Sequence, residues 1–400
     1  MRILLTANAS YAPPRGGATR SNLIWLDHLA RHGYTCRIVC GPSKPGAEFH
    51  HHQSIPILPV DEPSRRVQTL RREISEFRPD WVLVSSEDLG HGLLREAHHS
   101  AAGRVVYLAH TPQFFPFGPA SWNPNPFAAD LVAESAGIVT IGTHMADYVE
   151  RAVHRAPEVI HPPIYGEPPF PHYCNFDRGR LAMINPCAVK GISIFRAVAE
   201  RLPQYAFGAL PGWGTTAADR AALERLPNVE LLPHARQIDD FLSGVRLLLA
   251  PSLWYEGFGL IVMEAMLRGI PVITSDSGGL REAKHRTGYV IPVNTIEHYQ
   301  PSFDEHAMPL PVVPQNDPGP WVEAVEKLLT DRTEYQREAA VSRAAAGLFV
   351  QRLDAQWMEG FLTRLKPFGA PHAEKATVES LSPEKRALLL ERLRKRGMVR

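Results

Sequence analysis

Two glutamates flank a glycine-rich turn in the second half of the chain, Glu256 before it and Glu264 after it. The residues that follow Glu256 are Gly257, Phe258, Gly259 and Leu260. The stretch lies between a predicted strand and a predicted helix, where glycines let a ligand approach the main chain and free helix amides attract a phosphate. If the helix begins near Gly259, Glu264 lies about 7 Å further along its axis, which fits the step from a diphosphate to a ribose. The alternative is a strand-to-helix turn with two solvated glutamates.

A lysine follows an earlier predicted strand in a comparable position. Asn185 begins a short turn that ends at Lys190 and Gly191. Open α/β sheets bind ligands at the carboxyl ends of their strands, and a lysine there can meet a phosphate as a point charge. We therefore expect Lys190 to bind a phosphate, and the alternative is an exposed lysine at a helix start.

Two further segments of the first half follow predicted strands. The turn Gly16-Gly17 leads into a helix that contains Arg20, which we expect to contact either a phosphate or an acceptor, if it is not a surface cation. His110 begins a loop that is rich in aromatic residues, among them Phe114 and Phe115. Aromatic faces bury the apolar surface of sugars, so this loop is expected to form a sugar or acceptor site. A histidine with a purely structural role is the alternative.

Taken together, these motifs resemble the retaining family 4 glycosyltransferases of GT-B fold over roughly residues 1–365. The likeness rests on the Glu-x7-Glu stretch of residues 256–264, the segment 227–230, the segment 269–273, and Ser277-Gly278-Gly279 with Glu282. The resemblance implies an α/β fold of two Rossmann-like domains that face a cleft, with a C-terminal helix that crosses back to the N-terminal domain. It also implies that the nucleotide sugar binds in the second domain.

The resemblance assigns a role to each motif. Glu256 lies beside the donor sugar and diphosphate, the main chain of residues 257–259 faces them, and Glu264 holds the ribose. Lys190 stabilises the departing diphosphate, Gly17 faces that diphosphate from the first domain, and His110 touches the donor sugar. The family usually places an arginine upstream of the lysine, but Ile184 and Asn185 occupy that neighbourhood here. A hydrogen bond from Asn185 is expected to take over part of its function.

Alternating apolar runs and helical patterns predict how these motifs are positioned. Strands are expected at residues 2–7, 35–40, 81–85, 105–109 and 138–141, and again at 181–184, 205–209, 229–232, 246–250, 271–275 and 289–291. This pattern predicts a domain over residues 1–165 that binds the acceptor and a domain over 166–365 that binds the donor and includes the closing helices. A proline-rich loop is expected at 301–320, and Phe349, Leu353, Trp357, Phe361 and Leu365 predict one buried helical stripe.

The last segment, residues 366–400, is predicted to be a linker followed by a short basic helix. Residues 382–400 hold seven basic and two acidic residues, although the whole chain of 400 residues has a formal net charge of only +1. The beginning of this tail resembles linker segments of modular peptide and polyketide synthases, which suggests natural-product biosynthesis. An ordinary solvated helix and a helix that docks on a membrane surface or a synthase are the alternatives.

Composition excludes several other classes of protein. The balanced charge argues against a nucleic-acid partner, and the four scattered cysteines argue against a disulfide framework and favour the cytoplasm. The apolar start is too short for a signal sequence. Residues 50–52 are all histidine, and we expect them in a polar loop with no fourth metal ligand at a suitable spacing. No metal is therefore expected, and no bound cofactor is expected either.

The sequence therefore predicts a glycosyltransferase that moves a sugar from a nucleoside diphosphate sugar to a small-molecule or lipid-linked acceptor. Within enzymes, a nucleotide-sugar epimerase or a glycan phosphorylase would share the architecture. Outside enzymes, a degenerate binding or scaffolding subunit is the alternative, and the missing upstream arginine is its best support. The sequence does not identify the nucleotide base, the sugar, the acceptor or the oligomeric state.

Overall fold

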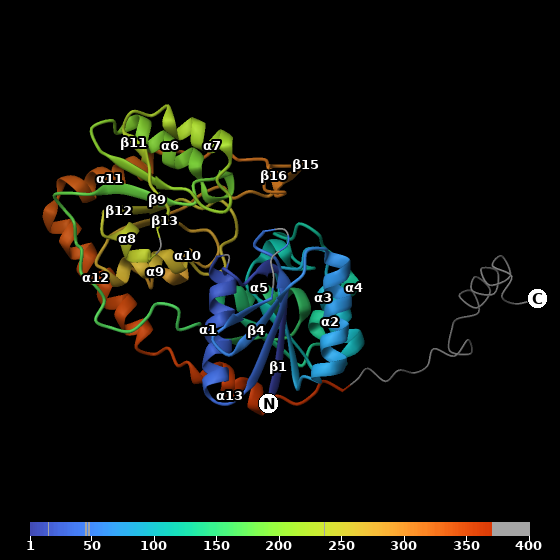
Figure 1. Ribbon diagram of the computed structural model, residues 1–400. Helices are drawn as coiled ribbons and strands as arrows, with labels where there is room; N and C mark the ends of the chain where they lie inside the picture. Colours follow the sequence, from blue (N-terminus) through green and yellow to red (C-terminus); the bar gives the residue numbers. More distant parts are fainter. Residues whose placement is uncertain (15, 45, 47–48, 236, 370–400) are drawn as a thin grey trace, which may run out of the picture.

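The computed structural model describes residues 1–14, 16–44, 46, 49–235 and 237–369. Within them the chain forms two α/β units, one drawn above the other in Figure 1, each built on its own sheet. The predicted linker beyond residue 369 and the predicted basic helix at 382–400 lie outside the described residues.

The first sheet has eight strands in the order β3-β4-β2-β1-β5-β6-β7-β8. Neighbouring strands of this sheet pair in parallel, except that β3 and β4 are antiparallel. The strands are β1 (Arg2–Ser10), β2 (Thr35–Gly41), β3 (His50–His52), β4 (Ile55–Pro59), β5 (Trp81–Ser85), β6 (Val105–Ala109), β7 (Gly137–Thr140) and β8 (Glu158–Val159). The helices of this half are α1 (Gly17–Arg31), α2 (Pro63–Phe77), α3 (Gly92–Ser100), the 3-10 turn η1 (Pro112–Phe114), α4 (Pro126–Ala133) and α5 (Thr143–Val153). The inner strands β5 and β6 are buried along their whole length, as expected of parallel strands covered on both faces.

The second sheet has six parallel strands in the order β11-β10-β9-β12-β13-β14. They are β9 (Arg180–Ile184), β10 (Phe207–Leu210), β11 (Val229–Leu231), β12 (Val245–Ala250), β13 (Val272–Ser275) and β14 (Val290–Ile291). The helices around them are the 3-10 turn η2 (Ala188–Lys190), α6 (Ile192–Arg201), α7 (Ala217–Glu224), α8 (Ile238–Leu242), α9 (Leu260–Leu267) and α10 (Leu280–Ala283). In each sheet the strand order reverses beside the first strand, between β1 and β5 and between β9 and β12, and such switch points are where open α/β sheets bind ligands.

The last helices join the two units. They are α11 (Gly319–Thr330), α12 (Arg332–Val350) and α13 (Gln356–Arg364). In Figure 1 α12 descends from the second unit, and α13 lies beside α1 and near the N-terminus. The indole N–H of Trp81 in β5 donates to the Leu362 carbonyl of α13 at 3.1 Å, and Met358, Phe361 and Leu362 are buried there. The expected return of a C-terminal helix to the first domain is therefore confirmed.

Three sequence predictions need correction. Residues 50–52 form an edge strand rather than a polar loop, because a turn at Gln53 pairs them with β4, and polar side chains suit a sheet edge. The predicted proline-rich loop contains a hairpin, β15 (Tyr299–Phe303) and β16 (Pro309–Pro311), since prolines are tolerated in a two-stranded ribbon that has only edges. The stripe at 349–365 is divided between α12 and α13, because Asp354 accepts the Gln356 N–H at 2.8 Å and starts a new helix. Trp357 of that stripe is 38% exposed.

Residues 160–179 separate β8 from β9 and contain no helix or strand. The domain limits at 165 and 365 stay predictions. A search of the described residues finds no helix with the length and apolar character needed to cross a membrane.

Candidate functional site

Lys190 and Glu256 meet beside the switch point of the second sheet. Lys190 ends η2, which follows β9, and Glu256 lies in the loop after β12. The Lys190 Nζ donates to the Glu256 Oε1 at 2.5 Å, and the Ser252 hydroxyl donates to the same oxygen at 2.6 Å. The ammonium also lies 4.6 Å from the ring centroid of Trp254, a cation–π contact. The structure thus brings together a cation and a carboxylate that the sequence separates by 66 positions.

Glycines of the second domain allow two loops to pack against each other. Gly278 has a φ of +57°, and a Cβ there would lie 2.3 Å from the Glu256 carbonyl oxygen. The Gly279 N–H donates to that same oxygen at 2.8 Å. A Cβ on Gly257 would lie 2.5 Å from the carbonyl oxygen of His110 in the first domain. These glycines are therefore required because main chains approach each other closely here. This role differs from the expected one, in which the glycines let a ligand approach the main chain.

The N-terminus of α1 meets the second domain at the same interface. A Cβ on Gly17 would lie 2.8 Å from the Leu260 Cδ1, and the Arg20 Nη2 lies 3.8 Å from the Glu264 Oε1. Burial raises the pKa of Glu264 to about 7, although the charges of Arg20 and Arg268 oppose this rise. The structure therefore brings the expected ribose-binding carboxylate together with Arg20, which we had expected beside a phosphate or the acceptor.

Glu282 forms a second bridge between the domains. Its two carboxylate oxygens accept the N–H groups of Thr143 and His144, each at 2.9 Å. These amides begin α5 of the first domain, and a carboxylate at a helix N-terminus is favoured by the helix dipole. Glu282, which the sequence analysis named only as part of a motif, thus holds the two domains together.

His110 follows β6 and is almost completely buried. Its Nε2 lies 2.8 Å from the Asn22 Oδ1, while the amide nitrogen of Asn22 donates to Tyr11 and Ser85 at 2.8 and 3.0 Å. Since the Asn22 oxygen must accept, the proton of His110 is on Nε2. Burial lowers the pKa of His110, although the charge of Glu87 raises it. The histidine is therefore neutral near pH 7, and its buried Nδ1 is an acceptor for which no hydrogen-bond partner is found among the described residues.

Glu87 is a site residue that the sequence analysis missed. It follows β5 at the switch point of the first sheet, and its carboxylate accepts hydrogen bonds from Ser85 at 2.5 Å and Thr111 at 3.2 Å. The sequence indicates Glu87 only through its position directly after a buried apolar strand. The first domain therefore has a half-buried carboxylate near His110.

The aromatic loop divides between two environments. Phe114 is partly exposed and contacts Trp122 edge-on, with a centroid distance of 5.3 Å. Phe115 is fully buried and packs against Tyr107 and Phe117 in the core of the first domain. The expectation that Phe115 lines an acceptor site is wrong, because no part of its side chain reaches the surface.

Aromatic residues from several segments gather next to Lys190. Trp122 of the first domain contacts Trp254 and Tyr299, at centroid distances of 6.4 and 5.6 Å. Trp254 also contacts Trp213, at 5.6 Å. We call Trp122, Trp213, Trp254 and Tyr299 the aromatic cluster. The sequence analysis missed it because its members come from distant loops and one hairpin strand.

Asn185 occupies the position where the resemblance had led us to look for an arginine. It has a φ of +54°, a conformation that asparagine tolerates better than most residues. Its Oδ1 accepts the Gly214 N–H at 2.8 Å, and no partner is found within the described residues for its buried Nδ2. Asn185 therefore keeps a free amide donor. Among the described residues, the side chains grouped like metal ligands come from the C-terminal end of α1 and from α13, and not from the surroundings of Lys190.

Two family profiles match the chain, one to each half. Residues 15–165 match the family described as Glycosyltransferase Family 4, and residues 182–331 match the family described as Glycosyl transferases group 1. The first match contains Arg20 and His110, and the second contains Lys190, Glu256 and Glu264.

Individual proteins show the same likeness. The chain is 25% identical to a GDP-mannose-dependent alpha-mannosyltransferase of Mycobacterium tuberculosis (strain CDC 1551 / Oshkosh) over 346 residues, which cover 76% of this chain and 88% of the relative. Among solved structures it resembles a sucrose-phosphate synthase from Thermosynechococcus elongatus, with a TM-score of 0.69, 15% identity and coverage of 91% and 98% of the two chains. It also resembles Anabaena HepE in complex with UDP and glucose, with a TM-score of 0.65, 16% identity and coverage of 91% and 100%. These structural likenesses confirm the expected fold of two Rossmann-like domains.

Proposed function

Because the chain belongs to the family 4 glycosyltransferases of GT-B fold, we propose that it transfers a sugar from a nucleoside diphosphate sugar to an acceptor with retention of the anomeric configuration. The mannosyltransferase relative makes GDP-mannose the first donor to test, and the HepE complex makes UDP-glucose the second. The expected location is the cytoplasm, from the few scattered cysteines.

The observation that carries the proposal is the contact of Lys190 with Glu256 beside the switch point between β9 and β12. Breaking the anomeric bond leaves negative charge on the diphosphate, so a preorganised cation lowers the barrier. In the free enzyme Glu256 and Trp254 hold the Lys190 ammonium in position. When the donor binds, we propose that the ammonium is shared with the β-phosphate and that the Glu256 carboxylate faces the donor sugar.

The remaining donor contacts follow from the same arrangement. Glu264 accepts the ribose hydroxyls, a role that requires the ionised carboxylate when both hydroxyls donate. The unpaired Nδ1 of His110 accepts a hydroxyl of the donor sugar, and the free Nδ2 of Asn185 donates to the diphosphate. In this proposal, these protein groups and main-chain amides neutralise the leaving group without a metal ion.

Retention is explained by attack of the acceptor on the face that the diphosphate leaves. The leaving phosphate oxygen takes the proton of the acceptor hydroxyl, so no separate base is assigned. We propose that the acceptor binds against the first domain between Arg20 and Phe114, next to Trp122. A natural product is the proposed acceptor class, on the resemblance of the tail at 382–400 to synthase linkers.

The test is a transfer assay with a panel of GDP, UDP, dTDP and ADP sugars. We expect Lys190→Ala and Glu256→Ala to lose about 100- to 1000-fold in kcat while the proteins stay folded. Lys327→Ala and Glu323→Ala, at exposed positions of α11, are the matched controls. Unchanged turnover in the first two variants would refute the site. Release of a converted nucleotide sugar without acceptor would instead favour an epimerase, and donor binding without any product would favour a binding subunit.

A further inference from the structure

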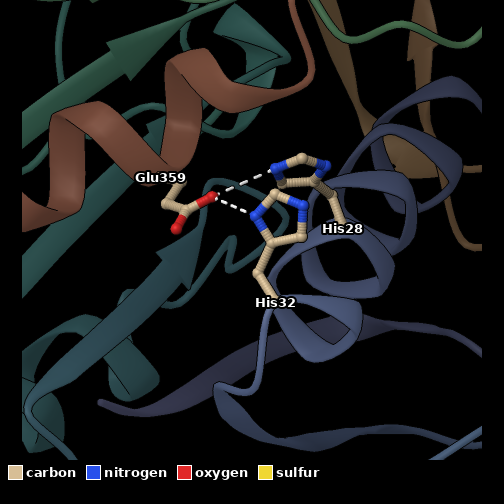
Figure 2. Close-up of side chains that lie close together, drawn as sticks. All are labelled: His28, His32 and Glu359. Carbon is tan, nitrogen blue, oxygen red and sulfur yellow. Dashed lines mark hydrogen bonds and ion pairs between the residues drawn. The ribbon is translucent and has the colours of Figure 1, made fainter.

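Three potential metal ligands converge where the C-terminal helix returns to the first domain (Figure 2). His28 lies on α1, His32 is the C-cap residue directly after α1, and Glu359 lies on α13. The His28 Nε2 is 3.2 Å and the His32 Nδ1 is 2.6 Å from the same carboxylate oxygen, Glu359 Oε2. The three ligand atoms all lie within 4.8 Å of one another, and no other group of this kind is found in the described part of the chain.

The fold determines this convergence. The His32 N–H still donates to the His28 carbonyl at 3.1 Å, as in a last helical turn, so the two side chains stay one turn apart on one side of α1. Both imidazoles contact Glu359 of α13, and their ring centroids are 4.0 Å apart. The Tyr34 hydroxyl donates to the Glu359 Oε1 at 2.9 Å, which fixes the carboxylate and leaves Oε2 to the two rings. Tyr34 thus acts as an outer partner of the kind that orients metal-binding carboxylates.

Two imidazole nitrogens and a carboxylate oxygen are a ligand set typical of Zn²⁺. Ligand distances of 2.0–2.2 Å in a tetrahedral site correspond to separations of about 3.4 Å between ligand atoms. The separation between His28 and Glu359 is already 3.2 Å, and the one between His32 and Glu359 must widen by about 0.8 Å. The His32 side chain is 40% exposed, so it has room for this movement.

We propose that His28, His32 and Glu359 bind Zn²⁺ and thereby clasp α13 to α1. The site is separate from the donor site, because His28 follows Arg20 by eight residues, which is about 12 Å along the helix. The same helix meets the donor domain at its N-terminus through Arg20 and Glu264. The ion would therefore fix the return of the C-terminal helix, and it would not touch the reacting atoms.

The test uses the full-length chain without a histidine tag, treated with a chelator and titrated with Zn²⁺ by calorimetry. We expect one Zn²⁺ per chain and a rise in melting temperature with added Zn²⁺, since a ligand of the native state stabilises it. Co²⁺ in its place should give the strong visible absorption of a tetrahedral site. His32→Ala and Glu359→Gln should weaken Zn²⁺ binding by more than 100-fold, and Tyr34→Phe by about tenfold.

His51→Ala is the matched control, because His51 is exposed and lies in the run of three histidines. It should bind Zn²⁺ as the parent does. The proposal is overturned if the parent binds no Zn²⁺, or if the Zn²⁺ affinity is unaltered in both His32→Ala and Glu359→Gln. Loss of binding in His51→Ala would overturn it too, because the ion would then lie at the run of three histidines. Tyr34→Phe keeps the test decisive if a ligand variant fails to fold, because unaltered affinity in Tyr34→Phe would also contradict the site.

Discussion

Replacing Glu264 with glutamine should stabilise the folded protein at alkaline pH while it weakens donor binding. Glu264 is 5% exposed, and burial raises its pKa from 4.5 to about 7. A rise of this size corresponds to about 3 kcal/mol between the protonated and ionised forms. The glutamine cannot ionise, so it avoids this cost and keeps the size of the side chain.

The sign follows from proton binding in the two states. Between pH 4.5 and about 7 the folded protein binds more protons at Glu264 than the unfolded chain does, because the folded pKa is the higher one. This residue therefore lowers the stability of the parent progressively as pH rises through that window. The stabilisation of Glu264→Gln relative to the parent should be small at pH 4.5 and should reach about 3 kcal/mol above pH 7.5.

The assay is thermal unfolding of parent and Glu264→Gln from pH 5 to pH 8.5. A difference of about 3 kcal/mol corresponds to roughly 6–12 °C for a domain of this size. Glu323→Gln, at an exposed position of α11, is the control and should follow the parent. Parallel melting curves of parent and Glu264→Gln across the pH range would refute the argument that burial of an ionised Glu264 is costly. In the same proteins, donor affinity should rise with pH through about 7 in the parent and stay flat in the variant.

Three further changes test the packing around the site. Gly257→Ala places a Cβ 2.5 Å from the His110 carbonyl oxygen, so the main chain must shift and kcat/KM should fall by about 100-fold in a steady-state assay. An unaltered kcat/KM would show that this contact is unimportant. Trp122→Ala should raise the KM for the acceptor by about tenfold without a change in kcat. A change in the donor KM alone would show that the aromatic cluster binds the donor and not the acceptor. Lys284→Met should destabilise the fold by about 3–5 kcal/mol in denaturant unfolding, because it removes the buried cation of Glu338 and leaves only the longer 3.6 Å ion pair with Arg337. The double variant with Glu338→Met should recover most of that loss.

The sequence predicted those parts of the fold that depend on local pattern. Continuous apolar runs located the inner strands, so β5 and β6 have the predicted limits. Edge elements were missed because their pairing depends on partners and not on their own composition. The histidines at 50–52 form a strand only because β4 lies beside them.

The same distinction applies to the site. Lys190 and Glu256 were expected in one site because each follows a strand of the second sheet, and the structure brings them together. Phe114 and Phe115 could not be told apart, because neighbouring residues of a loop have no periodicity that separates a buried ring from an exposed one. The aromatic cluster and the group on α1 and α13 depend on tertiary contacts between distant segments, and no spacing in the sequence indicates them.

The central claim is that Lys190 neutralises the β-phosphate of the leaving nucleotide. It is tested most directly by measuring the affinity of parent and Lys190→Ala for the nucleoside diphosphate and for the monophosphate of the same base. A charge-assisted contact of about 1.5–3 kcal/mol predicts that Lys190→Ala binds the diphosphate about 10- to 100-fold more weakly and the monophosphate equally well. Equal losses for the two nucleotides, or no loss for either, would contradict the account.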